Sequence, residues 1–239
     1  MGYHIGFDIG STTIKAVVLD ENNQICYKSY ERHKAQVRQK ALDKLVELKK
    51  YTKEPFKFAI SGSGALGLSE QGELPFVQEV FASATGVSKL YPETDCAIEL
   101  GGEDAKILFF QGSVEQRMNS TCAGGTGAFI DQMATLLNMS LEEMNEASLN
   151  YHRLYPIASR CGVFAKTDIQ PLINQGVDKC DLCASIFQAV VDQTITSLAQ
   201  GRKIEGNILF LGGPLYFMSG LRNRFVETLK LSDVQVNCP

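Results

Sequence analysis

The sequence predicts an α/β protein made of two lobes that share one order of strands and helices. Three strand-like runs, then helical patterns, then a strand and a helix occur in residues 1–94 and again in residues 95–239. A residue-level repeat supports this duplication. In residues 8–15 and 99–106, an acidic residue, an apolar residue and a glycine are followed by a lysine at the same spacing. We therefore expect an N-terminal lobe over 1–94 and a C-terminal lobe over 95–239.

The first lobe begins with a three-stranded antiparallel meander. Its strands are predicted by alternating apolar and polar residues, by β-branched residues and by turns between the runs. Apolar residues at helical spacing then predict the first helix. The expected elements are strands over 3–9, 14–20, 25–32 and 56–60, and helices over 35–50 and 76–90.

The second lobe repeats the pattern and adds more helices. Its expected elements are strands over 96–100, 105–110, 114–118 and 208–211, and helices over 126–137, 141–149, 181–199 and 219–229. Residues 234–239 resemble one more strand, and nothing follows it that could form a closing helix. We expect that helix to be missing by truncation, with this chain as a piece of a longer protein.

Composition excludes several functional classes. The 239 residues carry a formal net charge of -4, with 44% hydrophobic and 21% charged residues, as in an ordinary soluble globular protein. The sequence has no basic stripe of the kind that indicates nucleic-acid binding. It also has no apolar run near the roughly 18 residues that a membrane helix needs. The N-terminus lacks a signal-peptide pattern, so we expect a cytoplasmic protein. Seven cysteines in that setting indicate free thiols, metal ligands or redox groups rather than disulfides.

The turn after the first strand has the parts of a phosphate site. Glycine lets successive backbone N–H groups converge on an anion, hydroxyls add donors, and a neighbouring carboxylate can hold the water shell of Mg2+. Lysine adds a point charge for a phosphate. The alternative is a tight hairpin with a capping aspartate. The candidate residues are Asp8, Gly10, Ser11, Thr12, Thr13 and Lys15.

Two further glycine turns complete the pattern. The second contains Glu99, Gly101, Gly102, Glu103 and Asp104, and its acids suit a phosphate only with Mg2+ between them. The third turn follows a buried strand and allows close approach of a flat ring or a ribose. The alternative is an ordinary turn that connects a strand to a helix. Its residues are Gly212, Gly213 and Pro214.

The segments D-I-G-S-T-T-I-K, E-L-G-G-E-D and F-L-G-G-P resemble the two phosphate motifs and the adenosine motif of the actin and sugar-kinase superfamily. This resemblance implies an actin-like ATPase fold, with two ribonuclease-H-like lobes around a nucleotide cleft that binds ATP or ADP with Mg2+. It implies that Asp8 organises Mg2+ and that Glu99, Glu103 or Asp104 positions water or metal. Residues 62–67 match a dinucleotide fingerprint by letter, but they follow a meander, and we interpret them as a loop lining the cleft.

Two cysteines have settings that suit an anionic ligand. Cys122 comes just before the helix expected over 126–137, whose positive end stabilises a thiolate. Cys161 follows Arg160 and precedes a glycine. For either cysteine alone, the alternative is a small buried residue. Cys180 and Cys183 share one helix face and are more simply explained by packing.

The segments N-S-T-C-A-G-G-T-G-A-F and I-A-S-R-C-G-V-F-A resemble the cluster-binding segments of the activators of 2-hydroxyacyl-CoA dehydratases and their benzoyl-CoA reductase relatives, the BadF/BadG/BcrA/BcrD type of ATPase. The resemblance implies that Cys122 and Cys161 of each copy hold a 4Fe–4S cluster that bridges a homodimer, since four thiolates are needed. Gly125 and Thr126 of the first segment are expected to contact the cofactor. The segments Y-H-I-G-F-D-I-G-S-T-T, A-I-E-L-G-G-E-D-A-K and F-A-K-T-D-I-Q look more like the long members of the family, in which activator-like regions are fused to dehydratase-like parts.

We therefore expect an ATP-hydrolysing electron-transfer activator whose partner is a dehydratase or a reductase. We expect this activator to bind neither nucleic acid nor a membrane. One alternative is a small-molecule kinase on the same fold, for which we find no unambiguous general base. Another is a non-catalytic, nucleotide-switched assembly module. Fold resemblance does not separate these three, because one fold hosts many functions. The cysteine segments favour the activator.

Overall fold

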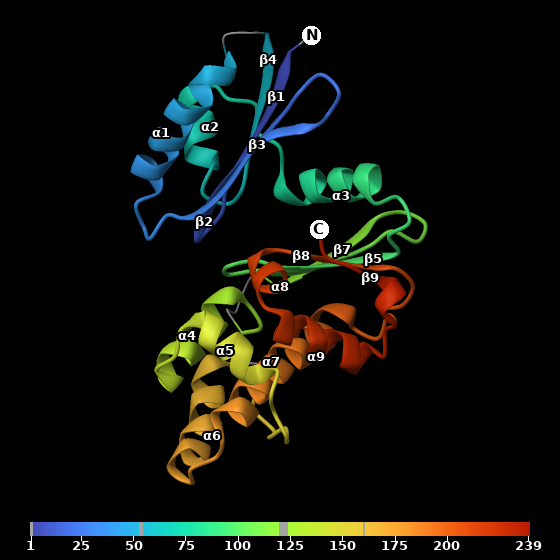
Figure 1. Ribbon diagram of the computed structural model, residues 1–239. Coiled ribbons are helices and arrows are strands. Elements are labelled where there is room, and N and C mark those ends of the chain that lie inside the picture. Colours follow the sequence, from blue (N-terminus) through green and yellow to red (C-terminus); the bar gives the residue numbers. More distant parts are fainter. Residues whose placement is uncertain (1, 53–54, 120–123, 160) are drawn as a thin grey trace. The chain divides into compact units, whose positions relative to one another are not determined.

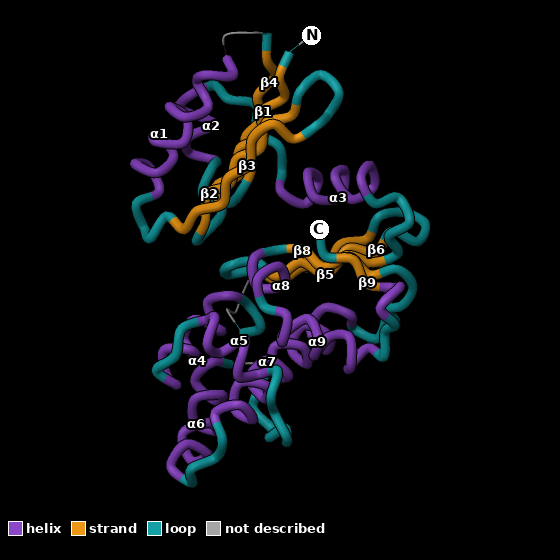
Figure 2. The backbone as a smooth tube through the Cα atoms, viewed as in Figure 1, coloured by secondary structure: helices purple, strands orange, loops and turns teal. Residues whose placement is uncertain are grey.

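The computed structural model describes residues 2–52, 55–119, 124–159 and 161–239, and the chain divides into two compact units (Figure 1). Unit 1 is Met1–Gly86 and unit 2 is Val87–Pro239. The division falls inside helix α3 (Glu79–Leu90), whereas the sequence placed the boundary after residue 94, and that boundary stays a prediction. Each unit combines one β-sheet with helices, as Figure 2 shows.

Unit 1 has a four-stranded sheet in the order β3-β2-β1-β4. Its elements are β1 (Tyr3–Ile9), β2 (Thr13–Leu19), β3 (Ile25–Arg32), α1 (Val37–Leu48) with a 3-10 turn (Lys49–Thr52), β4 (Phe56–Ser61), α2 (Leu66–Gly72) and the first part of α3. The strand β1 runs antiparallel to β2 and parallel to β4.

Alternation along the strands gives the sheet of unit 1 one apolar face. Ile5, Phe7 and Ile9 are buried with residues of β2 and β4 against α1 and α2. Full burial of each such side chain stabilises the fold by roughly 1.5–3 kcal/mol. The residues between them, such as Asp8, therefore project from the opposite face of the sheet.

Unit 2 has a five-stranded sheet in the order β7-β6-β5-β8-β9. Its strands are β5 (Cys96–Leu100), β6 (Ala105–Phe109), β7 (Glu115–Asn119), β8 (Ile208–Leu211) and β9 (Val236–Asn237). Its helices are α4 (Gly127–Leu137), α5 (Leu141–Ser148), α6 (Gly162–Asn174), α7 (Lys179–Thr194) with a π-helical end (Ile195–Ala199), α8 (Gly213–Phe217), α9 (Ser219–Leu229) and a 3-10 turn (Asp233–Gln235). Side chains of α4, α5, α6, α7 and α9 form one apolar core with a single face of the sheet.

The two sheets confirm the duplicated strand order that the sequence predicted. In both, the first strand lies between the second strand, which is antiparallel to it, and the fourth, which is parallel. In unit 2, β9 adds a parallel pairing to β8. At the equivalent edge of unit 1, the described residues form an isolated parallel bridge from Ile60 to Phe76. The helix expected over 76–90 accordingly starts later, at Glu79.

Three helices, α2, α6 and the five-residue α8, were not predicted. The helix α6 buries only Ala165 and Ile169 completely and contains Pro171, so its apolar stripe is thin. The helix α2 is only seven residues long, and its sequence looked like a glycine loop. Short or weakly amphipathic helices depend on tertiary packing, which periodicity does not report.

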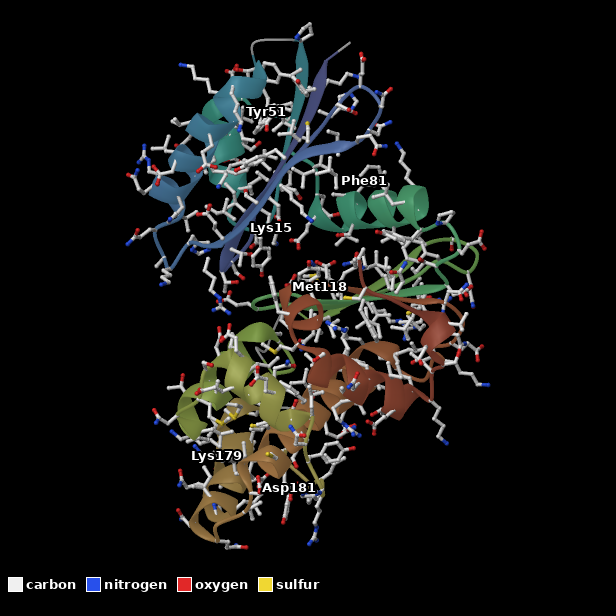
Figure 3. The ribbon with its side chains drawn as sticks, viewed as in Figure 1. Lys15, Tyr51, Phe81, Met118, Lys179 and Asp181 are labelled. Atoms are coloured by element: carbon white, nitrogen blue, oxygen red, sulfur yellow. The ribbon has the colours of Figure 1, made fainter. Side chains whose placement is uncertain are left out.

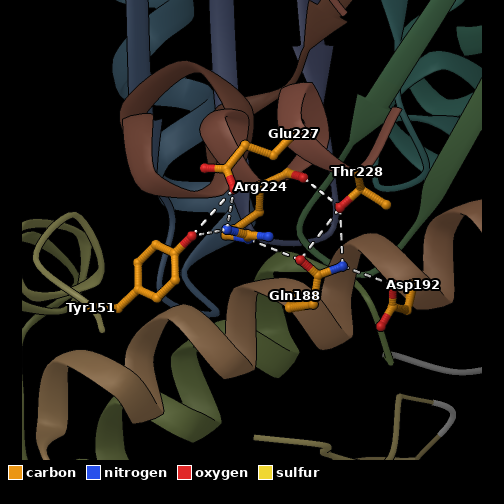
Figure 4. A network of polar contacts seen from close by, with 6 residues as sticks. All are labelled: Tyr151, Gln188, Asp192, Arg224, Glu227 and Thr228. Carbon is orange, nitrogen blue, oxygen red and sulfur yellow. Dashed lines mark hydrogen bonds and ion pairs between the residues drawn. The ribbon is translucent and has the colours of Figure 1, made fainter. Parts of the chain in front are cut away.

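The helix α7 is the central element of unit 2, and most of its residues are buried. In the described part of the chain, the stretch Lys179–Ala199 is the one helix whose length and composition suffice to cross a membrane, and it is largely buried inside the protein. A polar network fixes it to α9 (Figure 4). Arg224 donates to Gln188 Oε1 at 2.9 Å and to Glu227 Oε2 at 2.7 Å, and its guanidinium also reaches the Tyr151 hydroxyl.

Candidate functional site

The first candidate turn is built around a carboxylate and a lysine on neighbouring strands. Asp8 on β1 lies directly opposite Lys15 on β2, and Lys15 Nζ donates to Asp8 Oδ2 at 2.6 Å. The other carboxylate oxygen, Asp8 Oδ1, is buried and has no hydrogen-bond partner among the described residues. The carboxylate therefore offers one free oxygen to a ligand while the lysine neutralises the other.

The chain between these residues forms a tight hairpin turn. The Gly10 N–H donates to the Thr13 carbonyl at 2.9 Å. His33, which is 5% exposed, supports the turn from the end of β3. Its backbone N–H donates to the Thr12 carbonyl at 3.1 Å, and its ring Nε2 lies 3.2 Å from the Gly10 carbonyl oxygen. Ser11 is exposed and Thr12 is half-buried, so their hydroxyls lie at the surface of the turn, whereas Thr13 is buried.

The glycine segment over 62–67 lies beneath Asp8. Gly62 follows β4 with φ of +99°, a conformation that favours glycine. A Cβ at Gly62 would lie 2.4 Å from Asp8 Oδ1 and 2.3 Å from the Ile9 carbonyl oxygen. The Gly64 N–H donates to that same Ile9 carbonyl at 2.8 Å. This segment thus lies in direct contact with Asp8 and Ile9 of the first candidate site. In the sequence, only its glycines indicated such a role.

The second candidate turn contains a buried lysine with two acids. Glu99 on β5 lies directly opposite Lys106 on β6, which is 1% exposed. Lys106 Nζ lies 3.5 Å from Glu99 Oε1 and 2.8 Å from Asp104 Oδ2. Glu103 is exposed at the tip of the turn. A Cβ on Gly101 would lie 2.0 Å from Asp104 Oδ1, so glycine is needed for this acid to fold back over the turn.

The second turn is fastened to the start of α4. The N–H groups of Gly127 and Ala128 donate to the carbonyls of Gly101 and Gly102 at 3.0 and 2.7 Å. A Cβ on Gly127 would lie 3.1 Å from the Gly101 carbonyl oxygen and 3.3 Å from Pro214 Cγ. The predicted second phosphate turn, the beginning of α4 and the third glycine turn therefore meet at one place in unit 2.

The third turn depends on a left-handed glycine. Gly212 follows β8 with φ of +89°, and a Cβ there would lie 2.0 Å from the Leu100 carbonyl oxygen. It is the N-cap of α8, which starts at Gly213 with Pro214 in its first turn. Because β8 lies next to β5, this turn is adjacent to the acidic turn that follows β5. The structure thus brings two of the three predicted motifs together within one unit.

Two more predicted contacts lie just before α4. Gly125 has φ of +80°, and a Cβ there would lie 3.0 Å from Gln193 Cγ on α7. Thr126 is the N-cap of α4 and is completely buried. Gln193 Oε1 is itself buried with no hydrogen-bond partner in the described residues. The segment thus packs closely on α7, and close packing explains its glycine without a ligand.

The cysteines differ in their surroundings. Cys122 lies outside the described residues, and Cys161 is the partly exposed N-cap of α6. Burial raises the pKa of the Cys183 thiol to about 12, and this residue belongs to the core. Cys180 is partly exposed, and burial together with Asp178 raises its pKa. Among the described residues, no three His, Cys, Asp or Glu side chains lie close enough together to hold a metal ion.

A protein-family model and a curated relative both match most of this chain. The model of the BadF/BadG/BcrA/BcrD ATPase family matches residues 5–237. The "Activator of lactoyl-CoA dehydratase" of Anaerotignum propionicum is 30% identical over 217 residues, which are 88% of this chain and 83% of that protein.

Solved structures agree with that assignment. Component A of (R)-2-hydroxyglutaryl-CoA dehydratase from Acidaminococcus fermentans has a TM-score of 0.87 and 26% identity, with 100% of this chain and 92% of that chain covered. The activator of 2-hydroxyisocaproyl-CoA dehydratase from Clostridium difficile, solved with bound ADPNP, has a TM-score of 0.85 and 27% identity, with 99% and 88% covered. A ROK family glucokinase from Streptomyces griseus, at 16% identity and a TM-score of 0.52 with 99% and 94% covered, shares the fold alone. The predicted actin-like ATPase fold is confirmed.

Proposed function

The chain belongs to the BadF/BadG/BcrA/BcrD ATPase family, and on that premise we propose that it is an ATP-hydrolysing activator that supplies electrons to a 2-hydroxyacyl-CoA dehydratase or a benzoyl-CoA reductase type of enzyme. The observation that carries the proposal is the match over residues 5–237 combined with a doubled acid–lysine pair at the predicted phosphate turns. The proposed setting is a reducing cytoplasm, where thiols stay available.

The proposed nucleotide chemistry rests on the two turns. Asp8 keeps one carboxylate oxygen without a protein partner in the described chain, which suits the water shell of Mg2+. Lys15 is partly exposed and can place its charge on a phosphate. In the second turn Glu103 is the exposed acid, while Glu99 and Asp104 both contact Lys106. Among the acids proposed to orient the attacking water, Glu103 is therefore the least constrained.

The third turn supports the adenosine end of the proposed site. Gly212 lets the backbone of the turn pack directly on β5, where an added Cβ would lie 2.0 Å from the Leu100 carbonyl oxygen. A relative of similar structure was solved with bound ADPNP. Both facts favour ATP as the nucleotide, with ATP and water converted to ADP and phosphate in each cycle.

The electron-transfer part of the proposal rests on Cys161. Its thiol is partly exposed at the N-terminus of a thirteen-residue helix, where the backbone N–H groups stabilise negative charge. Gly162 follows it, and a Cβ there would already lie 3.3 Å from Gln132 Oε1, so the backbone beside the thiol is closely packed. When bound by two such thiolates from each of two copies, a 4Fe–4S cluster accepts and donates a single electron. We propose Cys122 as the second thiolate of each copy.

The test is an anaerobic reconstitution followed by iron and acid-labile sulfide analysis. We expect about four irons per dimer, with dimerisation measured by sedimentation. Cys161→Ser and Cys122→Ser should each abolish the cluster and leave ATP binding intact. Cys180→Ser, a change at a partly exposed thiol outside the proposed ligand set, is the matched control and should keep the cluster.

Two other results would redirect the proposal. A folded protein that binds and hydrolyses ATP without taking up iron would support a small-molecule kinase or a nucleotide-switched assembly module. Iron uptake that survives both serine substitutions would show that other thiols hold the cluster.

A further inference from the structure

Ser61 lies beside Asp8 on the neighbouring parallel strand. In the register of β1 and β4, Asp8 is paired with Ser61, just as Asp8 is paired with Lys15 in the register of β1 and β2. Residues in one such row project from the same face of a sheet. Lys15, Asp8 and Ser61 therefore form a polar row across three strands, on the face opposite the core of unit 1.

Two oxygens of this row lack protein partners. Asp8 Oδ1 and Ser61 Oγ are both buried, and neither has a hydrogen-bond partner within the described chain. A buried polar group without a partner is destabilising, and such groups in folded proteins usually meet water or an ion. The two atoms belong to directly neighbouring register positions, so one ligand shell can satisfy both.

The turn after β4 shows which way the carboxylate points. Asp8 Oδ2 is taken by Lys15 on the β2 side. Asp8 Oδ1 lies over Gly62, because a Cβ added to Gly62 would be 2.4 Å from it. The unpartnered oxygen thus faces the end of β4, where Ser61 is the last residue.

The duplicate in unit 2 shows that the fold does not need a hydroxyl here. Glu99 takes the place of Asp8, and its partner in the parallel strand β8 is Leu211. Both fourth strands end in a left-handed glycine, Gly62 and Gly212, packed against the first strand of their own sheet. The two positions therefore differ in side-chain chemistry while the backbone arrangement is the same.

We propose that Ser61 is a positioning residue for Mg2+, whose hydroxyl and Asp8 Oδ1 together hold waters of the metal's hydration shell when ATP is bound. This inference rests on the proposed ATPase function. Mg2+ prefers oxygen ligands and keeps several of its waters, so a carboxylate with a neighbouring hydroxyl suits it. Lys15 occupies the other side of the carboxylate and leaves this side for the metal.

The experiment measures equilibrium ATP binding by calorimetry across a Mg2+ titration, and again in EDTA. Ser61→Ala should raise the half-saturating Mg2+ concentration about tenfold, as loss of an outer-shell partner does, with ATP affinity in EDTA unchanged. Ser61→Thr keeps a hydroxyl and should restore the wild-type value. Ser29→Ala is the matched control: Ser29 Oγ is also buried without a described partner, but Ser29 pairs with Ala16 of the core face.

A Ser61→Ala protein with a wild-type Mg2+ requirement overturns the inference and leaves the ATPase proposal intact. A wild-type protein that binds no ATP at any Mg2+ concentration overturns the ATPase proposal, and the role of Ser61 with it. If Ser61→Ala fails to fold, Ser61→Cys replaces it, since a thiol has the same shape as the serine side chain, is only slightly larger, and is a poor partner for Mg2+-bound water.

Discussion

Lys106 Nζ lies 2.8 Å from Asp104 Oδ2, although only 1% of this lysine is exposed. Its counterpart in unit 1, Lys15, makes a 2.6 Å contact with Asp8 while its side chain is 37% exposed. The two lysines occupy the same place in the duplicated fold, opposite Asp8 and Glu99, but their surroundings differ. Buried charges interact more strongly and cost more to leave unpaired than exposed charges.

Lys106→Met should therefore destabilise the protein by about 2–3 kcal/mol, because Glu99 and Asp104 lose a charged hydrogen-bond donor. Lys15→Met should cost less than about 1 kcal/mol, since its ion pair is partly solvated. Urea unfolding followed by circular dichroism measures both. Equal losses in the two variants would contradict this distinction. Both variants should also weaken ATP binding, which calorimetry measures separately.

Gly212→Ala should destabilise the protein far more than Gly176→Ala. Both glycines have positive φ, so each alanine pays about 1–2 kcal/mol of backbone strain. Only at Gly212 does the added Cβ meet another atom, the Leu100 carbonyl oxygen at 2.0 Å, whereas at Gly176 nothing lies within 4 Å. Thermal unfolding of the two variants checks this. A similar loss in melting temperature would mean that β5 moves aside without cost.

Two buried thiols should make the fold sensitive to alkali. Burial raises the pKa of Cys96 and of Cys183 to about 12, above the ordinary value of 9.0. A thiol whose pKa is raised on folding contributes stability that is fully present below about pH 9 and is lost as the pH rises towards 12. The free energy of unfolding should fall across that interval. Cys183→Ala should flatten the decline, and a slope unchanged from wild type would contradict this assignment.

Asp181 should protect the fold against acid. It lies at the start of α7 (Figure 3) and accepts hydrogen bonds from the N–H groups of His152 and Arg153 at 2.7 and 3.0 Å. These bonds hold the pKa of Asp181 below its ordinary value of 3.8. Its contribution is present above about pH 4 and lost as the pH falls below it. Asp181→Asn should lose about 1 kcal/mol at pH 7 and less at pH 3, measured by urea unfolding at both values.

Much of the fold could be predicted from the sequence because its strands carry local signals. Alternation and turn glycines placed the strands within one or two residues, and the repeated acid-to-lysine spacing predicted the hairpins in which Asp8 meets Lys15 and Glu99 meets Lys106. The register across a hairpin follows from a short connection, so a seven-residue separation suffices to pair two side chains.

The remaining site residues depend on long-range contacts. Ser61 meets Asp8 only because β4 pairs in parallel with β1, more than fifty positions away in the chain, and no local pattern gives that register. His33 supports the first turn from the end of β3, and its isolated position in the sequence gave no sign of this contact. The helix α6 was missed because it has few buried residues, although it positions Cys161 at its N-cap.

The attachment of α4 to the acidic turn has a mechanical consequence. The first two amides of α4 hold the carbonyls of Gly101 and Gly102, so turn and helix cannot separate without breaking two hydrogen bonds. A displacement of about an ångström at the turn would be passed to the helix as a rigid-body shift, because hydrogen-bonded helices transmit strain along their axis better than loops. Any movement of the acidic turn would therefore also move α4, a helix of eleven residues.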